Sequence, residues 1–352
     1  MLFSFVWPRA RLAWRAMIRT GPRNLITDVE GLHVGQAEDA SARTGVTIVL
    51  ADVPAAAVVD VRGGAPGTRE TEALDPTGLV GTIDAIVLSG GSVYGLDAAS
   101  GVTAWLAANG RGFRVLSTAP PAPIVPAAIL FDLANGGEKD WGMTPPYRAL
   151  GIQAAESASR DFALGNAGAG FGAVAGAYKG GIGSASSLTD EGFTVGALAA
   201  VNAVGSPLIP GTDVFWAYPL EQNGEFGNRK PDSFSQINLD LPPDMKTAPR
   251  PSANTTIAIV ATDVELSRIE LKRIAIMAAD GFARALRPAH TPFDGDTVFA
   301  ISTAKLALGE PRALGVMRIG HLAADCLARA IARGVYEAQT LAHMKSYKDN
   351  FP

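Results

Sequence analysis

The chain has 352 residues, of which 47% are hydrophobic and 18% charged, and its formal net charge at pH 7 is -4. A chain of this composition can bury a large core, so we expect one large or two intimate globular domains and exclude a disordered or fibrous protein. The charges are spread along the chain, which leaves no basic patch for nucleic acid and favours a small molecule or a peptide as substrate.

The N-terminus, the apolar runs and the cysteine content bear on where the chain works. The N-terminus carries its apolar run before its arginines, the reverse of a secretory signal, so we expect a cytoplasmic location. No apolar run reaches the ~18 residues of a membrane span, because Asp52, Asp60 and Asp84 interrupt the best candidates, and no membrane partner is expected. The single cysteine, Cys326, lies in an apolar helical stretch, where we expect a buried and unreactive thiol.

The first part of the chain predicts strands and a helix in mixed order. Residues 1–24 look like an appended basic segment, and regular patterning begins near Asn24. Short apolar runs then alternate with glycine turns, which is typical of strands. Such an order predicts layers of helix and sheet. The strands are expected at 46–50, 55–61 and 83–88, and the helix at 96–108.

The middle of the chain is predicted to contain an exposed connection. A glycine and alanine tract at 165–183 is followed by an apolar run at 195–204 and by a polar stretch at 221–254. The polar stretch carries several prolines and few apolar residues, so we expect it to be exposed and poorly packed. The chain could be cut there without losing its core.

The C-terminal part begins with a β-branched apolar run at 256–262, which predicts a buried strand with Thr255 at its head. Ser267 and Glu270 form a capping box that starts a helix, and Pro288 ends that helix. The unit is completed by a strand at 297–302 and a final helix at 313–341, which could break near Gly320 or Gly334.

The usual catalytic and cofactor-binding patterns are missing from the sequence. Residues 90–94 lack the closing glycine of a nucleophile elbow. The 4 histidines are widely scattered, with no pair at metal-ligand spacing, so histidine triads and zinc sites lose support. Residues 168–173 formally fit a dinucleotide-binding glycine pattern, but no buried strand precedes them. We therefore expect no metal and no cofactor.

Thr255 is the remaining candidate nucleophile, because it opens a buried strand directly after the connection and follows Asn254. Its hydroxyl is a weak nucleophile, but attack on its own preceding carbonyl is intramolecular, and the resulting ester can hydrolyse. The released α-amine has an ordinary pKa of about 7.7–8.0 and can take the proton from the hydroxyl of the same residue. Acyl transfer would then need no catalytic histidine, whereas the ordinary alternative is a buried strand threonine.

Several distinctive motifs lie in order between about Asn24 and Leu341: RGGAPGTRET (62–71), GGSVYGLD (90–97), NTTI (254–257), ATD (261–263) and HTPFDGDT (290–297). Together they resemble the P1 or S58 peptidase family. That family includes L-aminopeptidase/D-amidase/esterases, β-peptidyl aminopeptidases and endo-type 6-aminohexanoate oligomer (nylon oligomer) hydrolases. Thr255 and the loop 294–296 look closer to the nylon oligomer hydrolases than to the serine aminopeptidases.

The resemblance implies an α/β fold of the α+β type, a four-layer αββα sandwich of the self-processing N-terminal nucleophile kind. It also implies autocleavage between Asn254 and Thr255. The products would be an α-chain, with 25–254 as its globular part, and a β-chain, 255–352, which together form one globular domain. This α/β heterodimer would assemble into a higher homo-oligomer and hydrolyse a small peptide or amide substrate.

The resemblance further assigns roles to residues, each beside an ordinary alternative. Thr255 would be the nucleophile and, through its amine, the base. Lys179 would be a cation beside it, or else a solvated loop lysine. Asn202 would serve the oxyanion hole, or else end a strand as a turn residue. Asp294 and Asp296 would hold the amine and hydroxyl of Thr255, within what could equally be an Asp-Gly hairpin turn.

The pocket residues are less specific. Ser92 and Tyr94 would form a pocket wall or simply serve the turn that carries them. Phe131 stands where family members carry a tyrosine that assists the oxyanion or the substrate, and a phenyl ring cannot donate a conventional hydrogen bond. Hydrolysis could be slower, or Tyr94 could supply the donor. We predict an N-terminal-threonine amide hydrolase and keep two alternatives open: a processed but catalytically weak binding or assembly protein of the same fold, and an acyltransferase.

Overall fold

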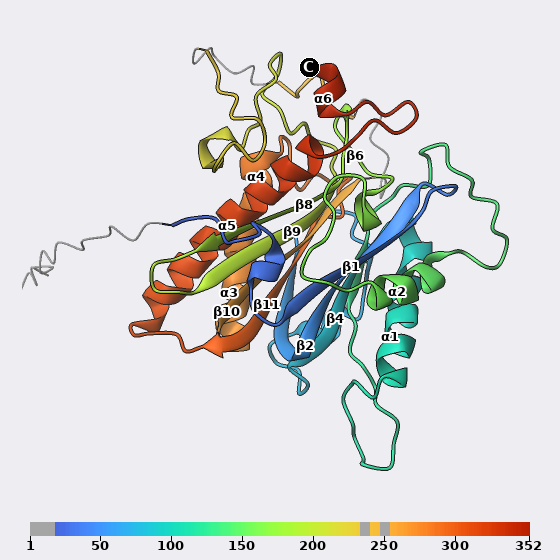
Figure 1. Ribbon diagram of the computed structural model, residues 1–352, viewed down its shortest axis with the longest axis vertical. Helices are drawn as coiled ribbons and strands as arrows, with labels where there is room; N and C mark the ends of the chain where they lie inside the picture. The colour runs from blue at the N-terminus through green and yellow to red at the C-terminus, as the bar shows by residue number, and fades with distance from the viewer. Residues whose placement is uncertain (1–17, 233–239, 247–253) are drawn as a thin grey trace, which may run out of the picture.

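The computed structural model describes residues 18–232, 240–246 and 254–352, along which helices and strands follow one another in mixed order (Figure 1). The strands are β1 (Leu32–Asp39), β2 (Thr44–Val61), β3 (Thr68–Arg69), β4 (Thr82–Ser89), β5 (Ala127–Ile129), β6 (Val174–Ala175), β7 (Tyr178–Lys179), β8 (Ile182–Leu188), β9 (Thr194–Asn202), β10 (Thr255–Val264) and β11 (Thr297–Leu306). The α-helices are α1 (Ala98–Ala108), α2 (Tyr147–Glu156), α3 (Arg268–Ala278), α4 (Asp280–Ala285), α5 (Arg312–Tyr336) and α6 (Tyr347–Asn350). Short 3-10 helices are η1 (Ile26–Asp28), η2 (Thr71–Leu74), η3 (Ser92–Asp97), η4 (Gly168–Gly170) and η5 (Tyr218–Leu220).

A large mixed sheet forms the centre of the fold. Within the described residues it has 9 strands, in the order β3-β5-β4-β2-β11-β10-β9-β8, with β1 paired to β2 off this path. The strands predicted at 46–50 and 55–61 are one strand, β2, whose first part pairs with β1 and whose last part pairs with β11. Pro54 lies where the register with β4 skips from Leu50 to Ala55, so its missing N–H removes no ladder bond to β4.

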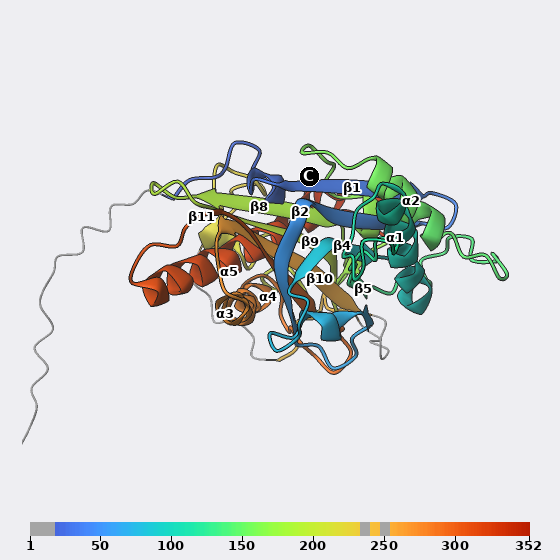
Figure 2. The same cartoon turned by 90° about the horizontal axis from the view of Figure 1, so that it is seen from below.

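Clusters of buried apolar side chains among the described residues show that the fold is layered. One cluster packs α1 and α2 against β1, β2 and β4, through residues such as Val46 and Leu150. A second lies between those strands and β9, β10 and β11, and includes Val34 and Ile257. A third packs α3, α4 and α5 against β8 to β11. The two helix groups thus flank two layers of strands (Figure 2), which confirms the αββα sandwich.

Helix α5 approaches the sheet closely because glycines lie at the contact. An added Cβ on Gly183 of β8 would lie 1.8 Å from the Ala330 carbonyl oxygen of α5. The expected break at Gly320 or Gly334 is wrong, because α5 is continuous and its glycines serve packing: an added Cβ on Gly334 would lie 3.0 Å from the Gly181 carbonyl oxygen. Although α5 is long, no helix in the described part of the chain is long and apolar enough to cross a membrane.

Local signals for the C-terminal helices are largely confirmed. Ser267 and Glu270 form the predicted capping box at the start of α3. The helix predicted to continue to Pro288 is divided, however, into α3 and the separate short helix α4. Gly281 of α4 lies against α5, where an added Cβ would be 2.5 Å from the Ala324 carbonyl oxygen. Cys326 on α5 is buried as predicted, and burial raises the pKa of its thiol.

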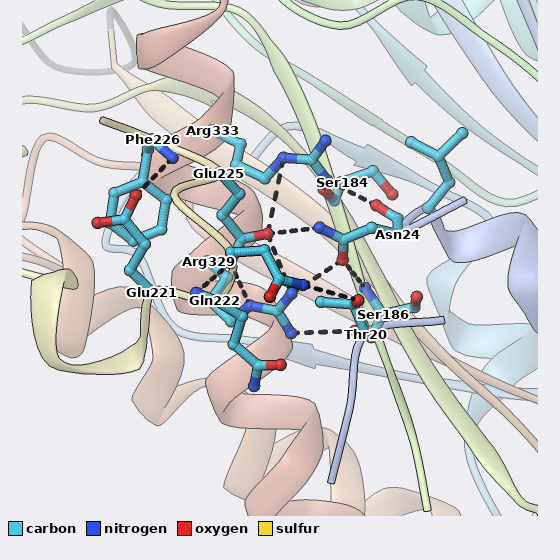
Figure 3. Close-up of polar contacts among 12 residues, drawn as sticks. Thr20, Asn24, Ser184, Ser186, Glu221, Gln222, Glu225, Phe226, Arg329 and Arg333 are labelled. Atoms are coloured by element: carbon cyan, nitrogen blue, oxygen red, sulfur yellow. Dashed lines mark hydrogen bonds and ion pairs between the residues drawn. The ribbon is translucent and has the colours of Figure 1, made fainter. Parts of the chain in front are cut away.

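A buried ion pair ties the loop before residue 230 to α5 (Figure 3). Arg329, whose side chain is 1% exposed, donates to Glu225 at 2.6 and 3.0 Å and to the Asn24 side-chain oxygen at 2.8 Å. Phe226 is also buried. The expectation of an exposed stretch over 221–254 is therefore wrong at Glu225, because a buried guanidinium requires a buried partner, and at Phe226, which packs against Phe215. Residues 233–239 and 247–253 of that stretch lie outside the described residues.

Residues 18–24 contact the sheet. The backbone of Arg19 pairs with Leu188 of β8 through hydrogen bonds of 3.1 and 2.7 Å. Gly21 donates its N–H to the Ser186 hydroxyl at 3.2 Å. An appended N-terminal segment stays a prediction for residues 1–17, which lie outside the described residues.

Candidate active site

Strand pairing brings three distant segments to the head of β10. Thr255 is the first residue of β10 and lies opposite Asn202, the last residue of the antiparallel strand β9. Strands β10 and β11 are parallel, with Ile257 opposite Thr297. Because parallel neighbours begin at the same edge of a sheet, the loop 290–296 that enters β11 lies beside Thr255. The sheet therefore gathers the predicted nucleophile, the asparagine and the acidic loop at one edge.

The hydroxyl of Thr255 contacts the carbonyl of the residue before it. Thr255 is 2% exposed, and its Oγ1 donates a hydrogen bond to the carbonyl oxygen of Asn254. The Gly295 N–H donates to the same oxygen at 2.9 Å. An added Cβ on Gly295 would lie 2.6 Å from Thr255 Oγ1, so the close approach requires glycine. The Asn254 carbonyl is thus held between a hydroxyl and a backbone donor.

Asp296 fixes the backbone that follows Thr255. Its Oδ1 accepts the Thr256 N–H at 2.8 Å, and its Oδ2 accepts the His290 N–H at 3.1 Å and contacts His290 Nδ1 at 2.9 Å. Burial alone would lower the pKa of His290, but the hydrogen bond and charge of Asp296 outweigh it and raise that pKa. His290 and Asp296 form an ion pair when the imidazole is protonated.

Asp294 holds the backbone near Asn202. Its Oδ1 accepts the Val204 N–H at 3.2 Å, and its Oδ2 accepts the Thr291 N–H at 2.9 Å and hydroxyl at 2.6 Å. Burial and the charge of Asp296 raise the pKa of Asp294. Asp296 therefore anchors Thr256, the residue after Thr255, whereas Asp294 anchors Val204 and Thr291. Direct contact of either carboxylate with the amine and hydroxyl of Thr255 stays a prediction.

Asn202 is held from several sides. Its Oδ1 accepts the Val174 N–H at 2.9 Å, and its Nδ2 donates to the Phe131 carbonyl oxygen at 3.1 Å. Lys246 Nζ lies 3.1 Å from the Asn202 carbonyl oxygen and 3.3 Å from Oδ1. Phe131 therefore meets the site through its backbone, and its phenyl ring is not the group that binds Asn202.

Lys179 is a buried amine rather than a solvated loop lysine. Its side chain is fully buried, and Nζ donates to the carbonyl oxygens of Gly170 at 3.0 Å and Gly180 at 2.7 Å. An added Cβ on Gly180 would lie 2.0 Å from the Val201 carbonyl oxygen, which places Lys179 near the end of β9. Burial lowers the pKa of Lys179 to about 7, against a smaller opposite effect of Asp132.

The pKa of Lys179 predicts a pH-dependent stability. A lysine with a folded pKa of about 7, against an ordinary value of 10.5, leaves the folded state with fewer bound protons than the unfolded state between these values. Stability contributed by this group therefore rises with pH over that window, by up to about 1.4 kcal/mol per pH unit. The methionine of Lys179→Met cannot titrate. The free energy of unfolding of this variant, relative to that of wild type, should therefore be higher at low pH than at high pH.

Urea unfolding of wild type and Lys179→Met at about pH 6, 7, 8 and 9 measures this difference. The free energy of unfolding of wild type minus that of the variant should climb above pH 7. A difference that stays flat with pH would mean that the buried amine keeps its ordinary pKa.

A cavity of about 400 Å³ opens beside Asn254 and Asn202. Burial raises the pKa of Asp132 in its wall to about 6, although Thr44 and Gly91 donate hydrogen bonds to this carboxylate at 2.6 and 2.8 Å. The cavity thus combines carboxyl, amide and amine groups with an apolar surface. Its lining residues are Phe131, Asp132, Ala134, Asn135, Gly172, Val174, Asn202, Lys246, Asn254, His343 and Met344.

Ser92 and Tyr94 lie on a different surface. Both belong to η3, and Ser92 has a positive φ of 52°. Tyr94 is 47% exposed and packs edge-on against Trp141, with ring centroids 5.7 Å apart. Among the described residues neither lines the cavity beside Asn202, so their role as a pocket wall stays a prediction.

Gly295, His290 and Lys246 belong to the site although no catalytic spacing marks them. Gly295 and His290 lie within the motif HTPFDGDT, which is the signal that could have pointed to them. Lys246 lies in a proline-bearing polar stretch and carries no such signal. In the described part of the chain, no group of at least 3 His, Cys, Asp or Glu side chains is placed to hold a metal ion.

The chain is similar to known proteins over most of its length. Residues 24–348 match peptidase family S58. An uncharacterized aminopeptidase of Mycobacterium tuberculosis is 45% identical over 346 residues, which cover 94% of this chain and 98% of the relative. A 6-aminohexanoate-oligomer endohydrolase of Kocuria sp. is 30% identical over 301 residues, 82% of this chain and 78% of the relative.

A solved structure supports the same assignment at the level of the fold. The L-aminopeptidase D-Ala-esterase/amidase of Ochrobactrum anthropi, a variant of the Ntn hydrolase fold, matches with a TM-score of 0.64 and 23% identity. The match covers 91% of this chain and 88% of that one. The match over residues 24–348 and the 45% identical relative show that the chain belongs to peptidase family S58 and is a hydrolase that acts on amide bonds.

Proposed function

We propose that this protein is a self-processing N-terminal-threonine hydrolase of peptide or linear amide bonds, with Thr255 as its nucleophile. One observation carries the proposal: the Thr255 hydroxyl contacts the Asn254 carbonyl oxygen, which also accepts the Gly295 N–H at 2.9 Å. A hydroxyl in contact with its own preceding carbonyl is placed for intramolecular attack. Membership of family S58 supports the amide chemistry.

Self-cleavage begins with attack of Thr255 Oγ1 on the carbonyl carbon of Asn254. The C–N bond between the two residues breaks, the acyl group moves to the hydroxyl oxygen as an ester, and the hydroxyl proton passes to the released amine. The Gly295 N–H stabilises the negative charge that develops on the carbonyl oxygen. Water then hydrolyses the ester, which leaves a carboxylate on Asn254 and a free amine on Thr255.

Turnover uses the same hydroxyl with the new amine as base. The neutral amine takes the hydroxyl proton as Oγ1 attacks the carbonyl carbon of a substrate amide. The proton passes to the leaving amine as the C–N bond breaks, and an acyl ester remains on Thr255. Water, deprotonated by the same amine, hydrolyses this ester, releases the acid and restores the threonine.

The neighbouring residues are assigned to support these steps. Asn202 lies opposite Thr255 in the sheet and serves the oxyanion. Lys179 is a buried amine with a pKa of about 7. When Lys179 is protonated, its positive charge disfavours a second charge on the Thr255 amine and so keeps that amine neutral. Asp296 holds the Thr256 N–H next to the nucleophile, Asp294 holds the Val204 N–H beyond Asn202, and both orient the Thr255 amine once it forms.

The substrates that we propose are short peptides, amino-acid amides or ω-amino-acid oligomers. The relatives support this range, because one is named as an aminopeptidase and another as a 6-aminohexanoate-oligomer endohydrolase. A cavity of about 400 Å³ suits a substrate of that size. We further propose that the α- and β-chains stay together as a heterodimer and form a higher homo-oligomer.

Intact mass of the denatured protein, followed over incubation time, tests the processing step. We expect two fragments, 1–254 and 255–352, and an N-terminal sequence of the smaller fragment that begins Thr-Thr-Ile. The processed sample should then hydrolyse amino-acid p-nitroanilides or 6-aminohexanoate oligomers. A single uncut polypeptide that still hydrolyses amides would contradict the proposed mechanism.

A further inference from the structure

Residues 240–246, here called the strap, are bound to the α-chain by their own contacts. The Asp244 carbonyl oxygen accepts the Ala177 N–H at 2.8 Å. The Asp244 carboxylate accepts the Ser206 hydroxyl at 2.5 Å and the Tyr178 hydroxyl at 3.3 Å. The Lys246 N–H donates to the Val204 carbonyl oxygen at 3.0 Å. All four partners precede the strap in the chain, so these contacts do not depend on the bond between Asn254 and Thr255.

The strap places a primary amine on the side chain of Asn202. Lys246 Nζ lies 3.3 Å from Asn202 Oδ1 and 3.1 Å from its carbonyl oxygen. The Val174 N–H donates to the same Oδ1, and Nδ2 donates to Phe131. Because donors face Oδ1 and an acceptor faces Nδ2, the side-chain amide of Asn202 can adopt only one of its two flipped orientations. When the amine is protonated, its charge on the oxygen also polarises the amide and strengthens hydrogen bonds made by the amide N–H groups.

The surroundings of Lys246 differ from those of an ordinary solvent-exposed lysine. It lines the cavity together with Asn202 and Asn254. Lys246 is half-buried, and the loss of solvent around its amine lowers its pKa to about 7, against the opposing charge of Asp294. Placing an amine where its charged form is disfavoured costs stability, and such placement is typical of functional sites.

We propose that Lys246 is a positioning residue for the hydrolysis: it holds and polarises the Asn202 amide, so that this amide stabilises the oxyanion formed on the substrate carbonyl. This inference rests on the proposed function of Thr255 and Asn202. Because the strap has its own contacts, Lys246 keeps this position after the chain is cleaved.

The test is a double-mutant cycle with amino-acid p-nitroanilides as substrate, with rates expressed per cleaved chain. Lys246→Met should lower kcat about 10- to 100-fold, less than the about 100- to 1000-fold loss typical of removing an oxyanion donor, with KM changed less than about threefold. Asn202→Ala should show the larger loss. Adding Lys246→Met to Asn202→Ala should cost nothing further, because Lys246 acts through the amide that is already gone.

Two further variants separate positioning from general stability. Lys246→Arg keeps the positive charge and a donor, and should recover most of the kcat lost in Lys246→Met. Lys230→Met removes an exposed lysine from the stretch that leads to the strap and should leave kcat and KM unchanged. If Lys246→Met does not fold or cleave, Lys246→Gln, which keeps a donor without the charge, takes its place in the cycle.

Wild type that is uncut and inactive would overturn the proposed function itself. Wild type that is cut and active, with Lys246→Met within about twofold of it, would overturn only the role of Lys246. The role of Lys246 would also be overturned if the kcat loss of the double variant equalled the product of the losses of Lys246→Met and Asn202→Ala. Such a product means that the two residues act independently, because independent effects add in free energy.

Discussion

Thr255→Val should give one intact chain with no measurable amide hydrolysis, whereas wild type should give two fragments. Valine keeps the β-branched shape that fits the head of β10 but has no hydroxyl to attack the Asn254 carbonyl. Without cleavage there is also no free amine to act as base. Loss of a nucleophile lowers kcat by about 10⁴-fold or more in related chemistry. Intact mass and p-nitroanilide turnover measure both effects.

Thr256→Val is the matched control for this substitution. Thr256 is the next residue of the same strand, it is fully buried, and its Oγ1 has no hydrogen-bond partner among the described residues. Removing an unsatisfied hydroxyl should leave processing intact and the fold at least as stable. If Thr255→Val were still cleaved at the same bond, or if Thr256→Val alone stopped cleavage, Thr255 would not be the nucleophile.

Gly295→Ala should block or strongly slow self-cleavage in a chain that still folds. The added methyl would lie 2.6 Å from Thr255 Oγ1 and 2.8 Å from the Ala65 carbonyl oxygen, so the hydroxyl or the loop must move. A misplacement of about 1 Å at a reacting group can cost about 100-fold in rate. Overpacking of this kind costs about 1–3 kcal/mol of stability. A time course of intact mass measures the cleavage rate.

Gly309→Ala provides the comparison for a methyl added without crowding, because an added Cβ on Gly309 meets nothing within 4 Å. It should cleave at the wild-type rate. Circular dichroism and thermal unfolding of Gly295→Ala show whether the fold survives. Cleavage of folded Gly295→Ala at the wild-type rate would rule out the close contact between Gly295 and Thr255 as a requirement for processing.

Elements that depend on local pattern were predictable. The β-branched run after Thr255 forms β10, and the capping box of Ser267 and Glu270 starts α3. Both follow from side-chain periodicity and hydrogen bonds within a few residues. Predictions failed where tertiary packing overrides such signals. Gly320 and Gly334 suggest a broken helix by propensity, yet they allow close approach of neighbouring elements to a continuous α5.

The candidate site divides in the same way. Thr255 is marked by its place at the head of an apolar strand, and the family motifs mark Asp294 and Asp296. The contact of Lys246 with Asn202 joins residues 44 positions apart and carries no mark in the sequence. The hydrogen bond from Gly295 to the Asn254 carbonyl depends likewise on the register of β10 beside β11.

The sequence by itself therefore determined the class of fold, the strand that begins at Thr255 and the family to which the chain belongs, because periodicity and ordered motifs are properties of the chain. Only the tertiary structure decided which distant groups meet that threonine, that Lys179 is buried and that Phe131 contributes its carbonyl. Strand register, loop entry and burial set those contacts, and they depend on the packing of the whole molecule rather than on any local run of residues.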